Sequence, residues 1–339
     1  MATVLPARIL IVRLGALGDV VNALALANAL VRERPDVEIG WVSHELAQPL
    51  LATHPSIARV HLLRRGSGLG GLMQVLREIR AQRYELALDL QRLTKSALIA
   101  RWSGAPRRIG FDRARTKESS WLWLGEHVAA ASATRPMAEQ ALDFAQHLGI
   151  GAPRIELELP RDAGAERWAQ AWMSERRAKL VLLNLAATKP ANRWPAQYWG
   201  ELAQRLCSRA ELVIALTGGP GDRELADQVL RSGGEGAVDL VGSTDLRQLI
   251  ALQRRAALVI SADTGPMHTA AAVGAPLLAL FGAADERRTG PVGQMQFVLR
   301  TRPKCAPCGK RNCPLPRHDC MLDLSVETVF RAATTRLEN

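Results

Sequence analysis

The stretch ILIVRLGALGD, residues 9–19, joins a short apolar run to a glycine-bearing turn near the start of a chain of 339 residues. Residues 9–12 are continuously apolar, which is typical of a parallel strand buried on both faces. Gly15 and Gly18 interrupt the pattern, and residues 20–32 are rich in alanine and leucine, which favours a helix. The stretch therefore predicts a strand, a turn and a helix, the opening part of a βαβ unit.

The same alternation continues through the first half and begins again in the second. Further strands of the first half are expected at 38–42 and 85–90, with helices at 72–82 and 94–102. In the second half we expect strands at 180–184, 212–216, 238–241, 258–261 and 277–281, with helices at 195–207, 223–231, 246–254 and 267–273. A segment with glycine and proline at 149–160 reads as a linker. The sequence thus predicts an α/β protein with two doubly wound, Rossmann-like domains, residues 1–155 and 156–339, that face each other across a cleft.

Composition limits the classes of protein that fit. No apolar run approaches the length of a membrane-spanning helix, and the N-terminus does not read as a secretory signal, so a cytoplasmic protein is expected. The net charge of +11 comes mostly from arginine and is shared by both halves. Such a surface favours phosphate-rich partners, although a GC-rich genome would give the same bias. A nucleic-acid-binding protein would fit the charge, but no recognition element for nucleic acid is visible, so we expect no such partner.

The turn after the first strand has two interpretations. A glycine turn that leads from a strand into a helix can hold phosphate, but this one has neither the G-x-G-x-x-G spacing of dinucleotide binders nor the ending of a P-loop. The missing glycine pattern argues against a nicotinamide oxidoreductase. Asp19 stands where the helix begins, so it could cap the helix, or it could act as a general base on a hydroxyl group.

A second polar turn follows the expected strand at 258–261. It reads Ser-Ala-Asp-Thr-Gly-Pro-Met-His over residues 261–268, and Pro266 suits the first position of a helix. The free amides and the positive dipole end of that helix would then favour a diphosphate, with His268 as an added donor. A capped helix with an incidental histidine is the alternative.

Two more loops follow expected strands of the second half. The first, residues 184–195, offers the hydroxyl of Thr188 and the cations Lys189 and Arg193, although it could be an ordinary loop. The second, residues 217–224, is a glycine turn that ends in Glu224. That carboxylate could bond ribose hydroxyls, or it could be an acid favoured by the helix dipole.

Four of the five cysteines lie close together near the C-terminus, at Cys305, Cys308, Cys313 and Cys320. Four thiolates can hold zinc tetrahedrally, but the irregular spacing lacks the paired C-x2-C pattern. A disulfide framework does not suit a cytoplasmic protein. Structural zinc is therefore the lesser alternative, and unliganded packing or redox-sensitive thiols are the greater one.

Taken together, the motifs resemble glycosyltransferase family 9, the lipopolysaccharide heptosyltransferases. The resemblance rests on ILIVRLGALGDVV at the start, NRWP in mid-chain, SADTGPMHTAAAVGAPLLALFG, and CAPCGKRNCPLPRHDCM near the end. They occur in the order of the family and span residues 9–321. The resemblance implies the GT-B fold, with acceptor binding in the N-terminal domain and nucleotide-sugar binding in the C-terminal domain.

The resemblance also implies roles for residues. Asp19 corresponds to the general base of an inverting transfer from ADP-heptose to the inner core of lipopolysaccharide, either lipid A–Kdo or a heptosylated core. The donor would be held by Thr188, Lys189, Arg193, Glu224, Asp263, Thr264, Gly265 and His268. No carboxylate pair for a divalent metal is evident in these segments, so no cofactor is expected. One departure is Asn192, which stands where the family usually has a lysine; Lys189 or Arg193 would have to replace it.

The acceptor is expected to be an anionic, lipid-linked saccharide. Its phosphates and carboxylates would be held by Arg13, Arg107, Arg113, Arg115 and Lys117, of which the last four belong to a basic run that could also be a solvated loop. Such an acceptor implies peripheral contact with the cytoplasmic face of the inner membrane. A related transferase for another nucleotide-sugar or acceptor, and a nucleotide- or nucleic-acid-binding protein without transferase activity, remain as alternatives.

Overall fold

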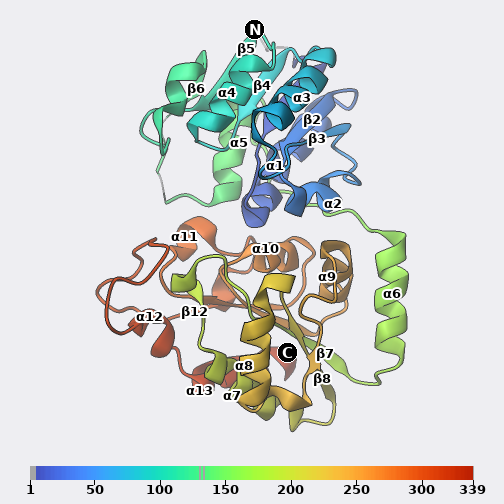
Figure 1. The fold of residues 1–339 in the computed structure, drawn as a ribbon, viewed down its shortest axis with the longest axis vertical. Coiled ribbons are helices and arrows are strands. Elements are labelled where there is room, and N and C mark those ends of the chain that lie inside the picture. The colour runs from blue at the N-terminus through green and yellow to red at the C-terminus, as the bar shows by residue number, and fades with distance from the viewer. Residues whose placement is uncertain (1–4, 130, 133, 339) are drawn as a thin grey trace. The chain divides into compact units, whose positions relative to one another are not determined.

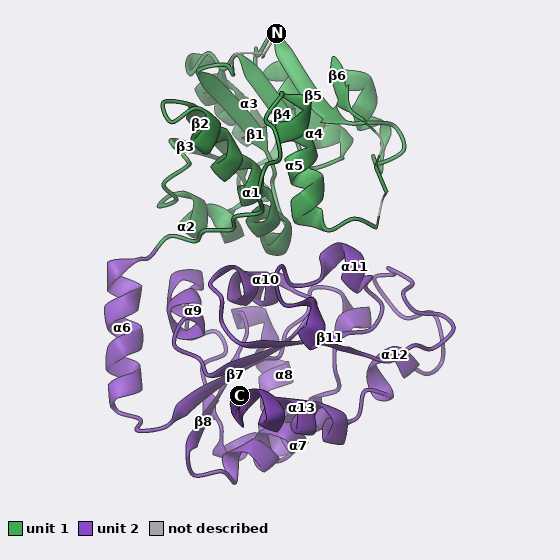
Figure 2. Ribbon diagram, turned by 180° about the vertical axis from the view of Figure 1, so that it is seen from behind, with its two compact units in different colours: residues 1–160 green, residues 161–339 purple. Residues whose placement is uncertain are grey.

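The computed structural model describes residues 5–338 except 130 and 133. The chain divides into two compact units, residues 1–160 and 161–339, which Figure 2 shows in green and purple. The division falls a few residues beyond the expected boundary at 155. No helix in the described part of the chain combines the length and the apolar character needed to span a bilayer.

Unit 1 is built on a parallel sheet of six strands in the order β3-β2-β1-β4-β5-β6. The strands are β1 (Arg8–Val12), β2 (Glu38–Ser43), β3 (Arg59–Leu62), β4 (Leu86–Asp89), β5 (Arg107–Phe111) and β6 (Glu126–Val128). The helices are α1 (Leu17–Glu33), α2 (Gln48–Leu51), α3 (Gly68–Ala81), α4 (Thr94–Trp102) and α5 (Met137–His147), with 3-10 turns η1 (Glu45–Ala47) and η2 (Ser119–Trp123). Helix α1 packs against α5. Helices α3 and α4 form a buried apolar cluster with residues of β1, β2 and β4.

Unit 2 repeats the design with the strand order β12-β11-β10-β7-β8-β9, again all parallel. Its strands are β7 (Lys179–Asn184), β8 (Leu212–Thr217), β9 (Val238–Asp239), β10 (Leu258–Ala262), β11 (Leu277–Phe281) and β12 (Val298–Arg300). Its helices are α6 (Ala163–Ser174), α7 (Ala196–Cys207), α8 (Arg223–Arg231), α9 (Leu246–Gln253), α10 (Gly265–Ala272), α11 (Glu286–Thr289), α12 (Asp319–Leu322) and α13 (Val326–Glu338). Figure 1 labels these helices together with β7, β8 and β12.

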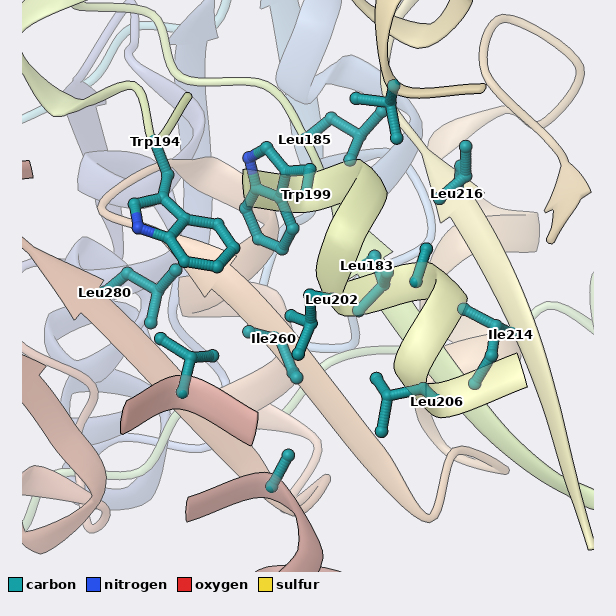
Figure 3. Packing of buried hydrophobic residues seen from close by; sticks show 14 of the residues in the cluster. Leu183, Leu185, Trp194, Trp199, Leu202, Leu206, Ile214, Leu216, Ile260 and Leu280 are labelled. Atoms are coloured by element: carbon teal, nitrogen blue, oxygen red, sulfur yellow. The ribbon is translucent and has the colours of Figure 1, made fainter. Parts of the chain in front are cut away.

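The core of unit 2 fixes the NRWP segment in place. Trp194 and Trp199 are fully buried and meet edge to face, with ring centroids 4.9 Å apart (Figure 3). The indole N–H of Trp194 donates to the carbonyl oxygen of Leu324 at 2.8 Å, which ties the segment to the end of the chain. Because each buried tryptophan removes a large apolar area from water, this pair anchors the loop that precedes α7.

The expected class, α/β with two doubly wound sheets, is confirmed. The prediction missed four strands: β3, β5, β6 and β12. β3, β6 and β12 lie at or beside a sheet edge, are short, and are half exposed, so no continuous apolar run marks them. β5 carries two arginines before its buried residues, which hid it in a basic run.

Candidate functional site

Arg13 and Asp19 form an ion pair across the turn between β1 and α1. Arg13 is buried, and its guanidinium donates to the carbonyl oxygen of Leu90 through Nη1 and meets the carboxylate of Asp19 through Nη2. The side chain of Asp19 is 33% exposed. A cavity of about 10 Å³ lies beside the pair, lined by Arg13, Asp19, Ala23, Leu90, Phe111, Met137 and Ala141. Arg13 therefore orients a carboxylate that solvent can still reach.

Asp19 does not cap α1. The N-cap is Ala16, and Asp19 lies in the first turn of the helix. The capping interpretation is therefore wrong, because the helix begins at Leu17, ahead of the start expected at Val20. An acid in the first turn is favoured by the helix dipole, which adds to the attraction of Arg13.

A glutamine holds the first residues of this turn. The backbone N–H groups of Leu14 and Gly15 point at Oε1 of Gln91, at 2.9 and 3.4 Å. Gln91 directly follows the strand expected at 85–90, so the sequence predicts that it lies at the carboxyl edge of the sheet. The sequence does not predict its contact with Leu14 and Gly15. Gln91 therefore fixes the start of the turn that carries Asp19, and the phosphate-cradle interpretation stays a prediction.

Asp89 is a titratable group near this platform that the sequence did not single out. It ends β4, pairs in register with Val12 of β1, and is 1% exposed. Burial raises the pKa of Asp89 to about 6, against the lowering effects of the Gln91 amide at 2.9 Å and of nearby Arg13. A buried carboxyl group thus sits behind the ion pair.

The second candidate site lies in unit 2 at the start of α10. Thr264 is the N-cap residue, and its side chain makes no capping hydrogen bond. The helix begins at Gly265, so Pro266 is its second residue, whereas the sequence predicts it as the first. His268 is buried, with Nε2 3.9 Å from Oδ1 of Asp263. The start of α10 suits an anionic ligand, because the positive end of the helix dipole lies there beside His268 and the hydroxyl group of Thr264, which makes no capping bond.

Asn192 belongs to this site, and its contact joins residues far apart in the sequence. Its Nδ2 donates to Oδ2 of Asp263 at 3.1 Å, while the side chain is 2% exposed. Its Oδ1 is buried and has no hydrogen-bond partner in the structure. The residue that departs from the family pattern therefore holds the carboxylate of the Asp-Thr-Gly segment.

The other expected donor residues occupy two loops at the same edge of the second sheet. Thr188 is exposed; Lys189 Nζ lies 3.4 Å from the carbonyl oxygen of Gly309, and Arg193 Nε donates to the carbonyl oxygen of Ala187 at 3.2 Å. Glu224 is exposed in the first turn of α8, and its side chain makes no hydrogen bond or ion pair with any described residue. Asn192 and Asp263 are in contact, whereas no contact links Glu224 to them.

The cysteine segment supports the loop of Lys189 and Asn192. The backbone N–H of Ala191 donates to the carbonyl oxygen of Arg311 at 3.1 Å, and the ring Nε2 of His318 lies 2.9 Å from the carbonyl oxygen of Ala191. Sequence reasoning gave His318 no role, because it lies inside the cysteine motif and far from the loop.

All four clustered cysteines line one cavity of about 180 Å³ beside this loop. They are free thiols, and burial raises the pKa of Cys320 to about 11. Over the described residues, no group of three or more histidine, cysteine or acidic side chains is placed to hold a metal ion. The four thiols line this cavity.

The basic run of unit 1 is divided by strand β5. Arg107 lies at the amino end of the strand and pairs with Glu126 at 2.9 Å, away from the edge where ligands bind. Arg115 is buried, with Nη1 2.7 Å from a carboxylate oxygen of Asp143. Both expectations of acceptor binding are corrected, because these guanidinium groups serve contacts within the unit. Arg113 and Lys117 are exposed in the loop after β5, and Arg13 serves Asp19.

Comparison with known proteins gives consistent results. The sequence profile described as glycosyltransferase family 9 (heptosyltransferase) matches residues 72–318. Lipopolysaccharide heptosyltransferase 1 of Pseudomonas aeruginosa is 31% identical over 327 residues, covering 90% of this chain and 87% of that protein. Lipopolysaccharide core heptosyltransferase OpsX of Haemophilus influenzae is 25% identical, covering 87% of this chain and 84% of that protein.

Solved structures show the same fold. The family 9 glycosyl transferase of Veillonella parvula superposes with a TM-score of 0.84 at 24% identity, covering 99% of this chain and 98% of that one. The ADP-heptose lipopolysaccharide heptosyltransferase II of Escherichia coli gives a TM-score of 0.78 at 22% identity, covering 97% and 98%. At these identities the likeness concerns the fold.

Proposed function

The chain belongs to glycosyltransferase family 9, and on that premise we propose that it transfers a heptose from ADP-heptose to the inner core of lipopolysaccharide. The acceptor would be lipid A–Kdo or a core that already carries heptose. The names of the relatives support the sugar and the acceptor class. The single observation that carries the chemistry is the ion pair of Arg13 with Asp19, because it orients a partly exposed carboxylate at the ligand-binding edge of unit 1.

In the proposed reaction Asp19 is the general base. Its carboxylate removes the proton of an acceptor hydroxyl, the oxygen forms a bond to the anomeric carbon of the donor, and the bond from that carbon to the diphosphate oxygen breaks. ADP leaves with the bonding electrons, and a single displacement inverts the anomeric centre. Arg13 keeps the carboxylate aimed at the acceptor hydroxyl.

The donor would bind at the start of α10. The backbone N–H of Gly265 and the positive end of the α10 dipole, with His268, would stabilise the negative charge that the diphosphate gains as it leaves. Lys189 and Arg193 would add cations from the neighbouring loop, and Thr188 and Glu224 would contact the nucleotide. We expect transfer without a divalent metal, since these groups supply the positive field.

The acceptor would be held by unit 1. Arg113 and Lys117 are exposed in the loop after β5, and their charge suits the phosphates and carboxylates of an anionic core saccharide. Raising the salt concentration should therefore raise the KM of the acceptor and leave that of the donor nearly unchanged. A lipid-linked acceptor would also place the enzyme at the cytoplasmic face of the inner membrane.

The experiment that tests the function is a panel of nucleotide-sugars with purified lipid A–Kdo and heptosylated core as acceptors. We expect ADP release and an inverted product with ADP-heptose, and a kcat about 10²–10⁴-fold lower with Asp19→Ala. Asp36→Asn is the matched control, because Asp36 is an exposed acid at the opposite end of α1. Turnover with another nucleotide-sugar instead would favour the alternative, a related transferase of the same family; nucleotide binding without any turnover would favour a binding protein.

A further inference from the structure

One layer of unit 1 carries an unusual share of the exposed apolar side chains. The layer consists of α3, α4 and η2, with the loops that flank η2. Five large hydrophobic residues protrude from it with exposures of 41–80%: Leu69, Met73, Trp102, Leu122 and Trp123. Elsewhere in the described residues, Leu46, Met295 and Leu315 are the other large hydrophobic side chains with comparable exposure. Because five such side chains protrude from one layer, we consider this layer as an interaction surface.

The three elements form one continuous layer. Val75 and Ile79 of α3 and Ala97 of α4 belong to the same buried cluster, and Leu124 after η2 joins it. The side chain of Arg80 donates to the carbonyl oxygen of Trp102 at 2.8 Å, which ties the end of α3 to the end of α4. Because the inner faces share a core, the outer faces lie on one side of the unit.

The charges on this layer are mostly positive. Its exposed cations are Arg77, Arg80, Arg83, Lys95, Arg101, Arg113 and Lys117, and its exposed acids are Glu78 and Glu118. Both acids are engaged locally: Glu118 accepts the backbone N–H of Thr94 at 2.7 Å, and Glu78 accepts from Gln74 at 3.1 Å. Leu69, Met73 and Arg77 are spaced four apart on α3, so they share one face of that helix.

We propose that the outer surface of the α3–α4–η2 layer binds the surface of an anionic lipid bilayer; this inference rests on the proposed function, because a lipid-linked acceptor resides there. Exposed leucine, methionine and tryptophan side chains enter the boundary between headgroups and acyl chains. The surrounding arginine and lysine side chains are attracted by anionic headgroups. The combination fits a bilayer surface better than a protein partner, since apolar and cationic side chains are interspersed across the layer.

The layer is connected to the turn of Asp19 through the loops at the carboxyl edge of the sheet. The backbone N–H of His44 donates to the carbonyl oxygen of Leu14 at 3.0 Å. The next residue, Glu45, accepts the backbone N–H of Arg65 at 2.8 Å, just before α3 begins. A bilayer bound at the layer would therefore be held in a fixed relation to the edge that carries the proposed base.

The test is co-sedimentation of the full chain with phosphatidylcholine vesicles, with and without a third of phosphatidylglycerol. We expect binding to the anionic vesicles to be about tenfold or more tighter than to the neutral ones, and to weaken with salt. Arg77→Glu combined with Arg101→Glu should remove that preference. Leu69→Asp combined with Leu122→Asp should weaken binding to anionic vesicles at every salt concentration. The matched control is Arg177→Glu with Arg231→Glu, two exposed arginines of unit 2.

Binding that is equal for both vesicles, or that survives in the layer variants, would overturn the proposal. Folding of each variant is checked by its thermal unfolding, and turnover is measured on a deacylated, water-soluble acceptor. Layer variants that keep this turnover but lose vesicle binding support the proposal. If no acceptor is turned over while the vesicle binding follows the layer variants, the proposed function fails and the bilayer surface stands.

Discussion

The guanidinium of Arg13 and the carboxylate of Asp19 are paired across six positions of the chain, from the end of β1 to the first turn of α1. Arg13 is buried and is held by the carbonyl oxygen of Leu90, so it acts as a fixed support, whereas Asp19 remains partly exposed. This relationship gives the carboxylate a defined direction without shielding it from a substrate.

Replacing Asp19 by asparagine should lower kcat by about 10²–10⁴-fold, because general-base assistance contributes an effect of that size. Donor binding should change little, since the donor is expected at unit 2. ADP release measures turnover, and calorimetric titration with ADP measures donor binding. Asp19→Glu should recover part of the turnover. An Asp19→Asn enzyme that turns over at the unsubstituted rate would remove this residue from the mechanism.

Replacing Arg13 by lysine should lower kcat by about tenfold, although the charge is kept. An ammonium group cannot serve the carbonyl oxygen of Leu90 and the carboxylate of Asp19 with the planar geometry of a guanidinium. Because Arg13 acts through Asp19, the double substitution with Asp19→Asn should be no slower than Asp19→Asn alone. Losses that multiply in the double variant would show that Arg13 works independently of Asp19.

The sequence was sufficient for the class of fold, because buried parallel strands are continuous apolar runs and eight of them were recognisable. It was also sufficient for the turns that end β1 and β10, where a polar cluster follows an apolar run. Arg107 and Arg115 were misplaced for a physical reason. The basic run looks uniform in sequence. In the structure Arg107 lies at the amino end of β5, whereas Arg115, in the loop after β5, is buried and paired with Asp143.

Asn192 tests the donor site of unit 2. Asn192→Ala removes the hydrogen bond to the carboxylate of Asp263, and a bond to a charged group contributes about 1.5–3 kcal/mol. We expect the donor KM to rise by about tenfold or more, with the acceptor KM unchanged. Asn192→Asp should be worse, because it sets a second carboxylate against Asp263. A donor KM unchanged in both variants would separate this contact from donor binding.

His318 tests whether the cysteine segment supports the donor loop. Its ring lies 2.9 Å from the carbonyl oxygen of Ala191, between Lys189 and Asn192. His318→Ala should raise the donor KM by roughly 5-fold, as expected for one lost hydrogen bond of about 1 kcal/mol, while kcat at saturating donor stays the same. Cys207→Ser, at the end of α7 and outside the cysteine cavity, is the control. A fall in kcat with an unchanged KM would contradict a supporting role.

These contacts could not be read from the sequence. Asn192 and Asp263 are 71 positions apart, and His318 lies 127 positions from Ala191. Local patterns place each residue in a loop, but the partner depends on which strands are neighbours. The order β12-β11-β10-β7-β8-β9 puts β10 beside β7, and that adjacency brings the two loops together.

Asp89 should make stability depend on pH with a definite sign. Burial raises its pKa from the ordinary value of 3.8 to about 6, so the folded chain holds this proton over a pH range in which the unfolded chain has lost it. The stabilisation is complete below about pH 4 and is lost as the pH rises through about 6. Asparagine cannot ionise, so the free energy of unfolding of the unsubstituted protein minus that of Asp89→Asn should fall by up to about 3 kcal/mol between pH 4 and pH 7. Urea unfolding at both pH values measures the difference.

Asp36→Asn is the control. Arg34 lowers the pKa of the Asp36 carboxyl group, so this variant should show no such fall. A difference for Asp89→Asn that stays constant with pH would mean that the Asp89 carboxyl group is not buried as the fold places it.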